Sequence, residues 1–187
     1  MTKVIAGMTV SLDGFVNDGS ESVSHTSPDA EKWQDSAIGQ EMIATTGAVV
    51  MGKRTYAMAD DPDLYAGHYE FQVPLFVLTH EPPKKLPKQN DKLTFTFVTD
   101  GVASAIAKAK IAAGNKDVTV IGGVSLIQQC LEAGLVDELH VDIMPVLLHK
   151  GLRLFENFEI PVKLEKLNVI ETGMRTHLRF RVTKEKG

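Results

Sequence analysis

The sequence predicts a three-layer α/β fold with a mixed, mainly parallel sheet and a C-terminal antiparallel hairpin. Segments with strand-like and helix-like patterns alternate through the first three quarters of the chain, which is typical of parallel strands joined by helices. Near the end, residues 162–171 and 175–183 flank the turn pair Thr172-Gly173 and predict two antiparallel strands. In the second of these strands Leu178, Phe180 and Val182 alternate with Arg179 and Arg181, as one half-buried face requires.

Length and composition narrow the classes of protein to consider. The chain has 187 residues, of which 43% are hydrophobic and 24% charged, so we expect one globular domain over residues 1–187. A net charge of −4 gives no indication of a nucleic-acid partner or an anionic membrane. No apolar run approaches the ~18 residues of a membrane span, and the N-terminal residues lack the pattern of a signal peptide. A single cysteine, Cys130, fits a reducing compartment, so we expect a cytoplasmic protein.

The first quarter of the chain predicts a strand, a loop and a helix. Residues 3–12 are rich in strand formers and end at the turn pair Asp13-Gly14. Residues 13–27 are small and polar and predict a long surface loop, which is often functional. A helix should begin at Ser27-Pro28-Asp29, because Ser27 can cap the free amides and proline suits the first helical position. We expect this helix to continue to about Thr45.

The remaining segments continue the alternation of strands and helices. Strands are predicted at residues 48–51, 73–79, 93–98, 118–121 and 136–148, helices at 53–59, 102–114 and 126–133, and exposed loops at 60–72 and 80–92. Open α/β sheets bind ligands at the carboxyl ends of their parallel strands. The residues that follow each strand are therefore the first candidates for a site.

The segment GKRT at residues 52–55 follows a predicted strand and opens a helix. With Gly47 it nearly matches a P-loop, but the four residues between the two glycines form a strand and no serine or threonine follows the lysine. A helix start with two cations and a hydroxyl nevertheless suits a pyrophosphate or ribose phosphate. A solvated basic turn explains the segment equally well.

The pair Gly122-Gly123 also stands between a buried strand and a helix. Paired glycines permit the close approach of a ligand, and Val124-Ser125 places further amides at the helix start. A simple turn is the more economical interpretation of this pair alone. Both glycine segments, however, follow parallel strands and would meet at one edge of the sheet.

Other residues that can carry chemistry indicate no further centre. The six histidines are dispersed and lie near no cysteine cluster, so we expect no metal site. His140 and His177 fall in strand patterns and are interpreted as structural or surface residues. Trp33 is expected in the core or in a pocket wall.

Several motifs resemble those of the dihydrofolate reductase-like family, and within it the reductase domain of the bifunctional riboflavin-biosynthesis deaminase–reductase. The resemblance runs nearly from end to end. It rests on SLDG at 11–14, TSP at 26–28, AMADDP at 57–62, and the longest and most specific stretch, AGLVDEL at 133–139 with PVLL at 145–148 and GLRLF at 151–155.

The resemblance implies a reductase that uses NADPH. Thr9 would lie near the nicotinamide amide, and Lys53 or Arg54 near the 2′-phosphate. The strand end at 78–80 would flank the adenosine, and the double-glycine segment would line the pyrophosphate and the nicotinamide ribose. The cofactor-binding residues implied are Thr9, Gly52, Lys53, Arg54, Thr55, Leu78, Thr79, His80, Gly122, Gly123, Val124, Ser125 and Leu126.

The substrate half matches the relatives less well. The riboflavin enzyme carries an arginine for the substrate phosphate where this chain has Ile38, and a glutamate for the pyrimidine where it has Ile121. Val73 stands where folate reductases carry an arginine for the glutamate tail. The candidate substrate-binding residues are Ser11, Ser22 and Trp33, of which Ser22 matches a substrate-contacting serine.

The chemistry that the resemblance implies is hydride transfer to an electron-poor C=N or C=O of a small heterocycle, with a proton supplied by the protein. Folate reductases use a carboxylate of the first helix for protonation, and Asp35 is nearest by spacing, with Glu31 and Glu41 as alternatives. Asp13 is the second catalytic candidate, although its position also fits a turn residue. A nucleotide-binding module or sensor without turnover is the alternative function.

The final hairpin predicts a homodimer. Its apolar face, Leu178, Phe180 and Val182, lies at the end of the sheet, where an edge strand needs covering. The family that the chain resembles also dimerises through this region.

Overall fold

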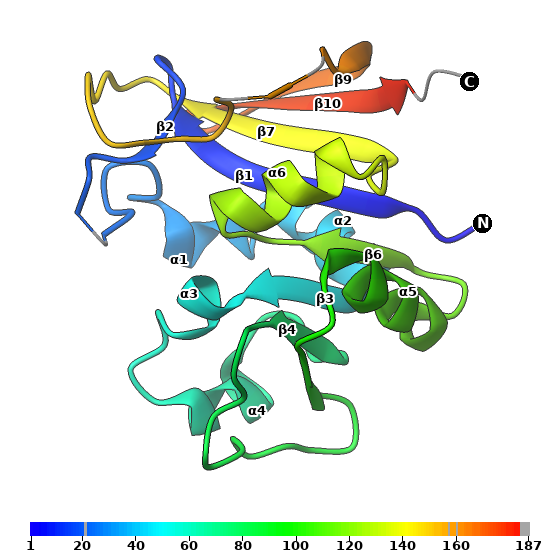
Figure 1. Cartoon of the computed structure of the whole chain (residues 1–187). Helices are drawn as coiled ribbons and strands as arrows, with labels where there is room; N and C mark the ends of the chain where they lie inside the picture. Colours follow the sequence, from blue (N-terminus) through cyan, green and yellow to red (C-terminus); the bar gives the residue numbers. More distant parts are fainter. Residues whose placement is uncertain (21, 157, 160, 184–187) are drawn as a thin grey trace.

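An eight-stranded sheet forms the centre of the molecule (Figure 1). The computed structural model describes residues 1–20, 22–156, 158–159 and 161–183. The strand order is β5-β4-β3-β6-β1-β7-β10-β9, with β1 Val4–Ser11, β3 Thr46–Gly52, β4 Leu75–Leu78, β5 Phe95–Val98, β6 Asp117–Val120, β7 Glu138–Met144, β9 Lys163–Thr172 and β10 Arg175–Thr183. The first six strands in this order are parallel, whereas β10 runs antiparallel to both neighbours. The predicted mixed sheet with its C-terminal hairpin is confirmed.

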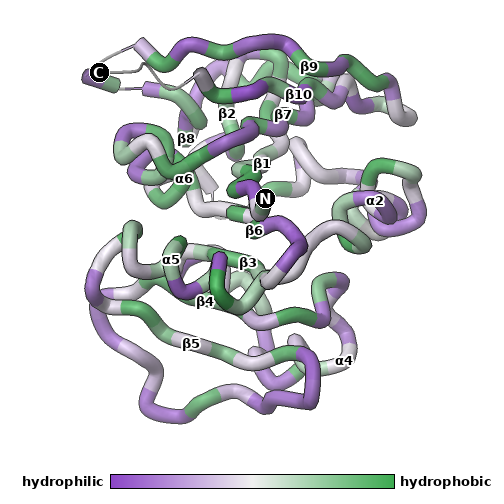
Figure 2. Tube along the Cα trace, turned by 90° about the vertical axis from the view of Figure 1, so that its right-hand side faces the viewer, coloured by the Kyte–Doolittle hydropathy of each residue, from purple (hydrophilic) through white to green (hydrophobic). Residues whose placement is uncertain are grey.

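Helices cover both faces of this sheet. They are α1 Ala30–Trp33, α2 Ala37–Thr45, α3 Lys53–Tyr56, α4 Tyr65–His68, α5 Val102–Ala113 and α6 Val124–Glu132, with a 3₁₀ turn η1 at Pro62–Leu64. Figure 2 shows α5 and α6 on one side of the sheet and α2 and α4 on the other, which gives the three predicted layers. In the part of the chain that is described, no helix is long and apolar enough to cross a membrane.

The core divides into two clusters, one on each face of the sheet. Along β3, Ala48 and Val50 point into the cluster beneath α5 and α6, whereas Val49 and Met51 point into the cluster that holds most of the buried aromatic rings. All four side chains are fully buried. A strand that is covered on both faces needs apolar residues at every position, which explains the unbroken AVVM run in the sequence.

The helix predicted from Ser27 to Thr45 is interrupted, so that prediction is wrong. The residue that precedes α1 is Asp29, and no side chain caps this helix. The break follows from Ser36, whose hydroxyl donates to the Trp33 carbonyl at 2.7 Å and accepts from the Gly39 amide at 3.0 Å, which starts α2. A Cβ on Gly39 would lie 2.1 Å from the Trp33 carbonyl oxygen, so the tight junction needs glycine there.

Four segments predicted as loops or longer elements also differ from the prediction. The loop at 13–27 contains a short strand, β2 Phe15–Asn17, which pairs with β8 Leu152–Arg153. The loop at 60–72 contains η1 and α4, and the helix predicted at 53–59 forms only the single turn α3. Strand β7 ends at Met144, because the next residue, Pro145, has no amide hydrogen to donate to a ladder.

Candidate active site

The two glycine segments meet at the carboxyl edge of the sheet. Their strands β3 and β6 are parallel neighbours, and the Gly52 amide donates to the Gly122 carbonyl at 2.7 Å. A Cβ on Gly52 would lie 3.3 Å from the Gly123 amide nitrogen, and one on Gly123 would lie 3.7 Å from the Thr55 hydroxyl oxygen. Gly122 has a φ of +120°, which side chains rarely adopt. The structure therefore joins both predicted phosphate-binding segments into one surface.

Backbone amides contribute to this surface mainly through α6. Gly123 precedes this nine-residue helix, and no side chain caps it. Val124 and Leu126 are buried in the core, so only their backbone can face a ligand, whereas Ser125 is exposed. The single turn α3 has little dipole of its own. At residues 53–55 an anion would therefore interact with the exposed cations Lys53 and Arg54 and with the hydroxyl of Thr55.

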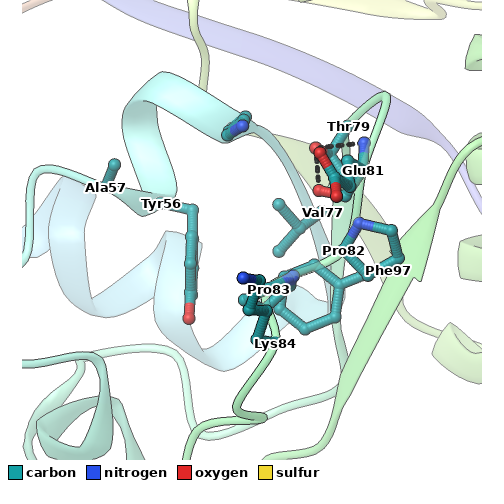
Figure 3. Close-up of a pocket in the computed structure, with 10 residues that line it drawn as sticks. Tyr56, Ala57, Val77, Thr79, Glu81, Pro82, Pro83, Lys84 and Phe97 are labelled. Carbon is teal, nitrogen blue, oxygen red and sulfur yellow. Dashed lines mark hydrogen bonds between the residues drawn. The ribbon is translucent and has the colours of Figure 1, made fainter.

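A cavity of about 280 Å³ lies beside Lys53 (Figure 3). Tyr56 and Ala57 stand on one side, and Pro82, Pro83 and Phe97 on the other. Thr79 lines the cavity, and its hydroxyl donates to the Glu81 carbonyl at 2.8 Å and accepts from the Glu81 amide at 3.2 Å. Its position at the end of β4 is where the adenosine was expected.

Not all residues expected at the adenosine end reach this cavity. Leu78 is half-buried against the core, and His80 and Arg54 are exposed; none of the three is among the residues that line the cavity. Lys84 and Glu81 line it instead. Sequence reasoning assigned Lys84 to a solvated loop, because nothing in the pattern shows that this loop folds back toward α3.

A buried arginine that the sequence analysis did not identify lies at the carboxyl end of β1. The guanidinium of Arg175 donates to both carboxylate oxygens of Asp29, with separations of 2.6–3.1 Å. It also donates to the Thr9 hydroxyl and to the Asp142 carboxylate, each at 3.0 Å. Only 6% of Arg175 is exposed. It holds the pKa of Asp29 below its usual range through these hydrogen bonds.

The network continues along β7 and β10. His177 donates from Nδ1 to Asp142 at 2.6 Å, because its Nε2 accepts from Arg179 at 3.0 Å and arginine can only donate. Arg179 is paired with both oxygens of Glu41 at 2.8 Å. His140 packs edge-on against His177, with ring centroids 5.4 Å apart, and burial lowers the pKa of His140. Both histidines are buried, as the structural interpretation expected.

A signal for this network was present in the sequence. Polar residues alternate along two predicted strands, Glu138, His140 and Asp142 on one and Arg175, His177 and Arg179 on the other. Alternation of this kind usually indicates a strand with one face exposed to solvent. Here Asp29, just before α1, and Glu41 of α2 bind arginines of this face, so the polar rows are covered and paired.

Asp13 holds a loop in place. Its carboxylate accepts from the Ser11 hydroxyl at 2.6 Å and from the amides of Leu148 and His149 at 3.1 and 2.8 Å. These hydrogen bonds, that from Ser11 first, lower the pKa of Asp13 to about 2. A carboxyl group with this pKa is ionised at neutral pH and cannot donate a proton. The contacts favour the turn role over the catalytic one, and Ser11, buried and bonded to Asp13, faces away from solvent.

The remaining candidates for catalysis and substrate binding surround α1. Asp35 is exposed in the link between α1 and α2, and among the described residues its carboxylate has no partner. Glu41 is bound to Arg179, which lowers the pKa of its carboxyl group and leaves it a poor acid. The side chain of Glu31 lies outside the described residues. Trp33 is half-buried against Phe71, and Ser22 is exposed, with its hydroxyl accepting from the Ser24 amide.

The chain belongs to the RibD C-terminal domain family, whose model matches residues 2–178. Two Bacillus subtilis (strain 168) proteins are similar over most of their length. The uncharacterized protein YyaP is 25% identical over 177 residues, covering 89% of this chain and 87% of that protein. The uncharacterized protein YwjB is 22% identical over 192 residues, covering 95% and 97%.

Solved structures show the same fold. A protein from Shewanella sp. PV-4 described as a riboflavin biosynthesis protein has a TM-score of 0.72 at 20% identity, with 98% of this chain and 100% of that chain covered. The deaminase/5-amino-6-(5-phosphoribosylamino)uracil reductase of Thermotoga maritima has a TM-score of 0.72 at 16% identity, and the match covers 97% of this chain and 57% of that one. Dihydrofolate reductase from Enterococcus faecalis, solved with NADP(H), has a TM-score of 0.59 at 14% identity over 97% of each chain. The predicted dihydrofolate reductase-like fold is confirmed.

Proposed function

We propose that this protein is an NADPH-dependent reductase that transfers hydride to a C=N or C=O group of a small pteridine-like or aminopyrimidine-like substrate. The observation that carries the proposal is the joined glycine surface at the ends of β3 and β6, with Lys53 beside the neighbouring cavity. NADP(H) in the Enterococcus faecalis reductase and the reductase family of the chain support the same cofactor.

The residues present fit NADPH. The start of α6 has no side-chain cap, so its free amides can bind a pyrophosphate, and the hydroxyl of Thr55 lies beside Gly122-Gly123 at the same place. Lys53 and Lys84 stand at the cavity where an adenosine 2′-phosphate would add two negative charges. When bound, NADPH supplies the hydride, whereas the chain binds, orients and excludes water.

The proton for the reduced substrate is assigned to Asp35 or to a water that it orients. Asp35 lies next to α1, which Arg175 ties to the carboxyl end of β1. Its carboxylate is free of partners among the described residues, unlike those of Asp13 and Glu41. We propose Trp33 and Ser22 as further substrate contacts.

A nucleotide-binding module without turnover is the second candidate. It is favoured by Ile38 and Ile121, which stand where the riboflavin enzyme carries substrate-binding charges. Loss of reduced-nicotinamide absorbance, followed with a panel of pterins, aminopyrimidines, quinones and dicarbonyls, separates the two functions. We expect turnover with a ring C=N or C=O acceptor. Tight NADPH binding without turnover on any acceptor would establish the module instead.

We further propose that two copies pair through the C-terminal hairpin. Strand β9 is the sheet edge, and Leu164, Leu167 and Val169 on it are 38–47% exposed. Leu178 and Phe180 behind it are only half-buried. Sedimentation at micromolar concentration should show a dimer, and a monomer would refute this part.

The free, buried thiol of Cys130, whose pKa burial raises to about 12, fits a cytoplasmic location.

A further inference from the structure

The hydroxyl group of Thr9 accepts a hydrogen bond, but its own hydrogen atom is not yet donated to any acceptor. Its oxygen accepts from Arg175 at 3.0 Å. Arginine only donates, so the hydroxyl hydrogen of Thr9 remains available for an acceptor. Within the described part of the chain no acceptor lies in reach of it, and Thr9 is only partly buried. The acceptor therefore has to come from solvent or from a ligand.

Arg175 fixes the direction in which this hydrogen can point. One of its terminal nitrogens is shared between Thr9 and Asp142, and the opposite edge of the guanidinium is held by Asp29. The contact occupies one side of the Thr9 oxygen and leaves the O–H bond directed away from Arg175. A donor bonded to a cation is also polarised and donates more strongly in its turn.

Thr9 stands at the same edge of the sheet as the glycine surface. The preceding residue, Met8, reaches Gly122, where an added Cβ would lie 2.9 Å from the Met8 terminal methyl group. Successive side chains of a strand point to opposite faces, so Thr9 faces α1 while Met8 faces the core. The parallel register pairs Ala6 of β1 with Val120 of β6, so the carboxyl end of β1, where Thr9 lies, is next to the segment that leads into Gly122-Gly123.

We propose that Arg175 is a positioning residue that orients and polarises the Thr9 hydroxyl to donate to the carboxamide oxygen of the nicotinamide. This inference rests on the proposed function. Asp29 and Asp142 set the plane of the guanidinium, and Asp29 at the same time connects the start of α1 to Arg175. A lysine at residue 175 would keep the charge but could not hold three partners in one plane.

The test compares NADPH with 2′-phospho-ADP-ribose, which keeps the adenosine end and the pyrophosphate but lacks the nicotinamide. Thr9→Val removes the hydroxyl at nearly constant volume and leaves Arg175 bonded to both aspartates. We expect it to weaken NADPH binding about ten-fold and to leave binding of the fragment unchanged. Thr9→Ser, which retains a hydroxyl, should bind NADPH within about two-fold of the original protein.

Arg175→Lys should act like Thr9→Val, and Arg181→Lys, on the same strand but paired with exposed Glu165, is the matched control. If Arg175→Lys does not fold, the test rests on Thr9→Val and on the comparison of its NADPH binding with its binding of the fragment. The inference is overturned if Thr9→Val weakens the binding of NADPH and of the fragment equally, or if it leaves NADPH binding unchanged. The proposed function stands in either case. Failure of the original protein to bind the fragment would overturn the proposed function itself.

Discussion

Replacing Arg175 by alanine is expected to lower the free energy of unfolding by about 3–5 kcal/mol, because removal of one partner leaves buried charges uncompensated. The carboxylates left behind are Asp29 and Asp142, whose side chains are 25% and 14% exposed. Water reaches Asp29 in part, so the lower end of this range is the closer expectation.

The measurement is chemical unfolding of the variant beside Arg181→Ala. Arg181 and Glu165 form an exposed pair, with side chains 55% and 59% accessible, so its loss should cost less than about 1 kcal/mol. An Arg175→Ala effect no larger than that of the control would show that the network does not hold α1 to the sheet.

The difference between the original protein and Arg175→Ala should also depend on pH. The pKa of Asp29 is lowered in the folded protein, chiefly by hydrogen bonds from Arg175. Its contribution is therefore present above the unfolded pKa of about 3.9 and is lost as the pH falls below that value. The difference in free energy of unfolding between the original protein and Arg175→Ala should therefore become smaller as the pH is lowered below about 3.9.

Replacing Asp35 by asparagine is expected to reduce turnover by about 10²-fold or more, because proton donation contributes that much to many reactions. The exchange keeps the shape of the side chain and removes its ability to titrate. NADPH affinity should be unchanged, because the proposed mechanism assigns Asp35 to the substrate and not to the cofactor. The measurement is steady-state kinetics with an acceptor from the panel.

Asp91→Asn is the matched control for Asp35, because Asp91 is an exposed acid in the loop before β5. It should leave turnover unaltered. If Asp35→Asn behaves like this control, Asp35 has no part in the reaction, and the proton reaches the substrate from water that no carboxylate orients.

The sheet and its phosphate edge could be predicted from local patterns. Unbroken apolar runs such as residues 48–51 indicate strands covered on both faces, and Gly52, the last residue of β3, and Gly122, shortly after β6, mark where these strands end. Since carboxyl ends of parallel strands share an edge, both glycine segments were predicted at one edge of the sheet. That β3 and β6 are neighbours, which brings Gly52 to Gly122, is known only from the structure.

The arginine network could not be predicted in this way. Thr9, Asp142 and His177 come together because they occupy one row across β1, β7 and β10, and this row depends on strand register. Local sequence sets which residues form a strand, but register across such long separations is set by packing of the whole sheet. Asp29 joins them from the position before α1, which lies outside these strands.

Thermal unfolding with and without NADPH, with NADH in parallel, tests the proposed cofactor site most directly. A ligand at about 100 times its Kd stabilises a protein by ~2.7 kcal/mol, and each kcal/mol raises Tm of a domain this size by about 2–4 °C. The account predicts a rise of roughly 5–11 °C with NADPH and a much smaller one with NADH. No rise with either nucleotide would contradict it, because the glycine surface at β3 and β6 would then bind no dinucleotide.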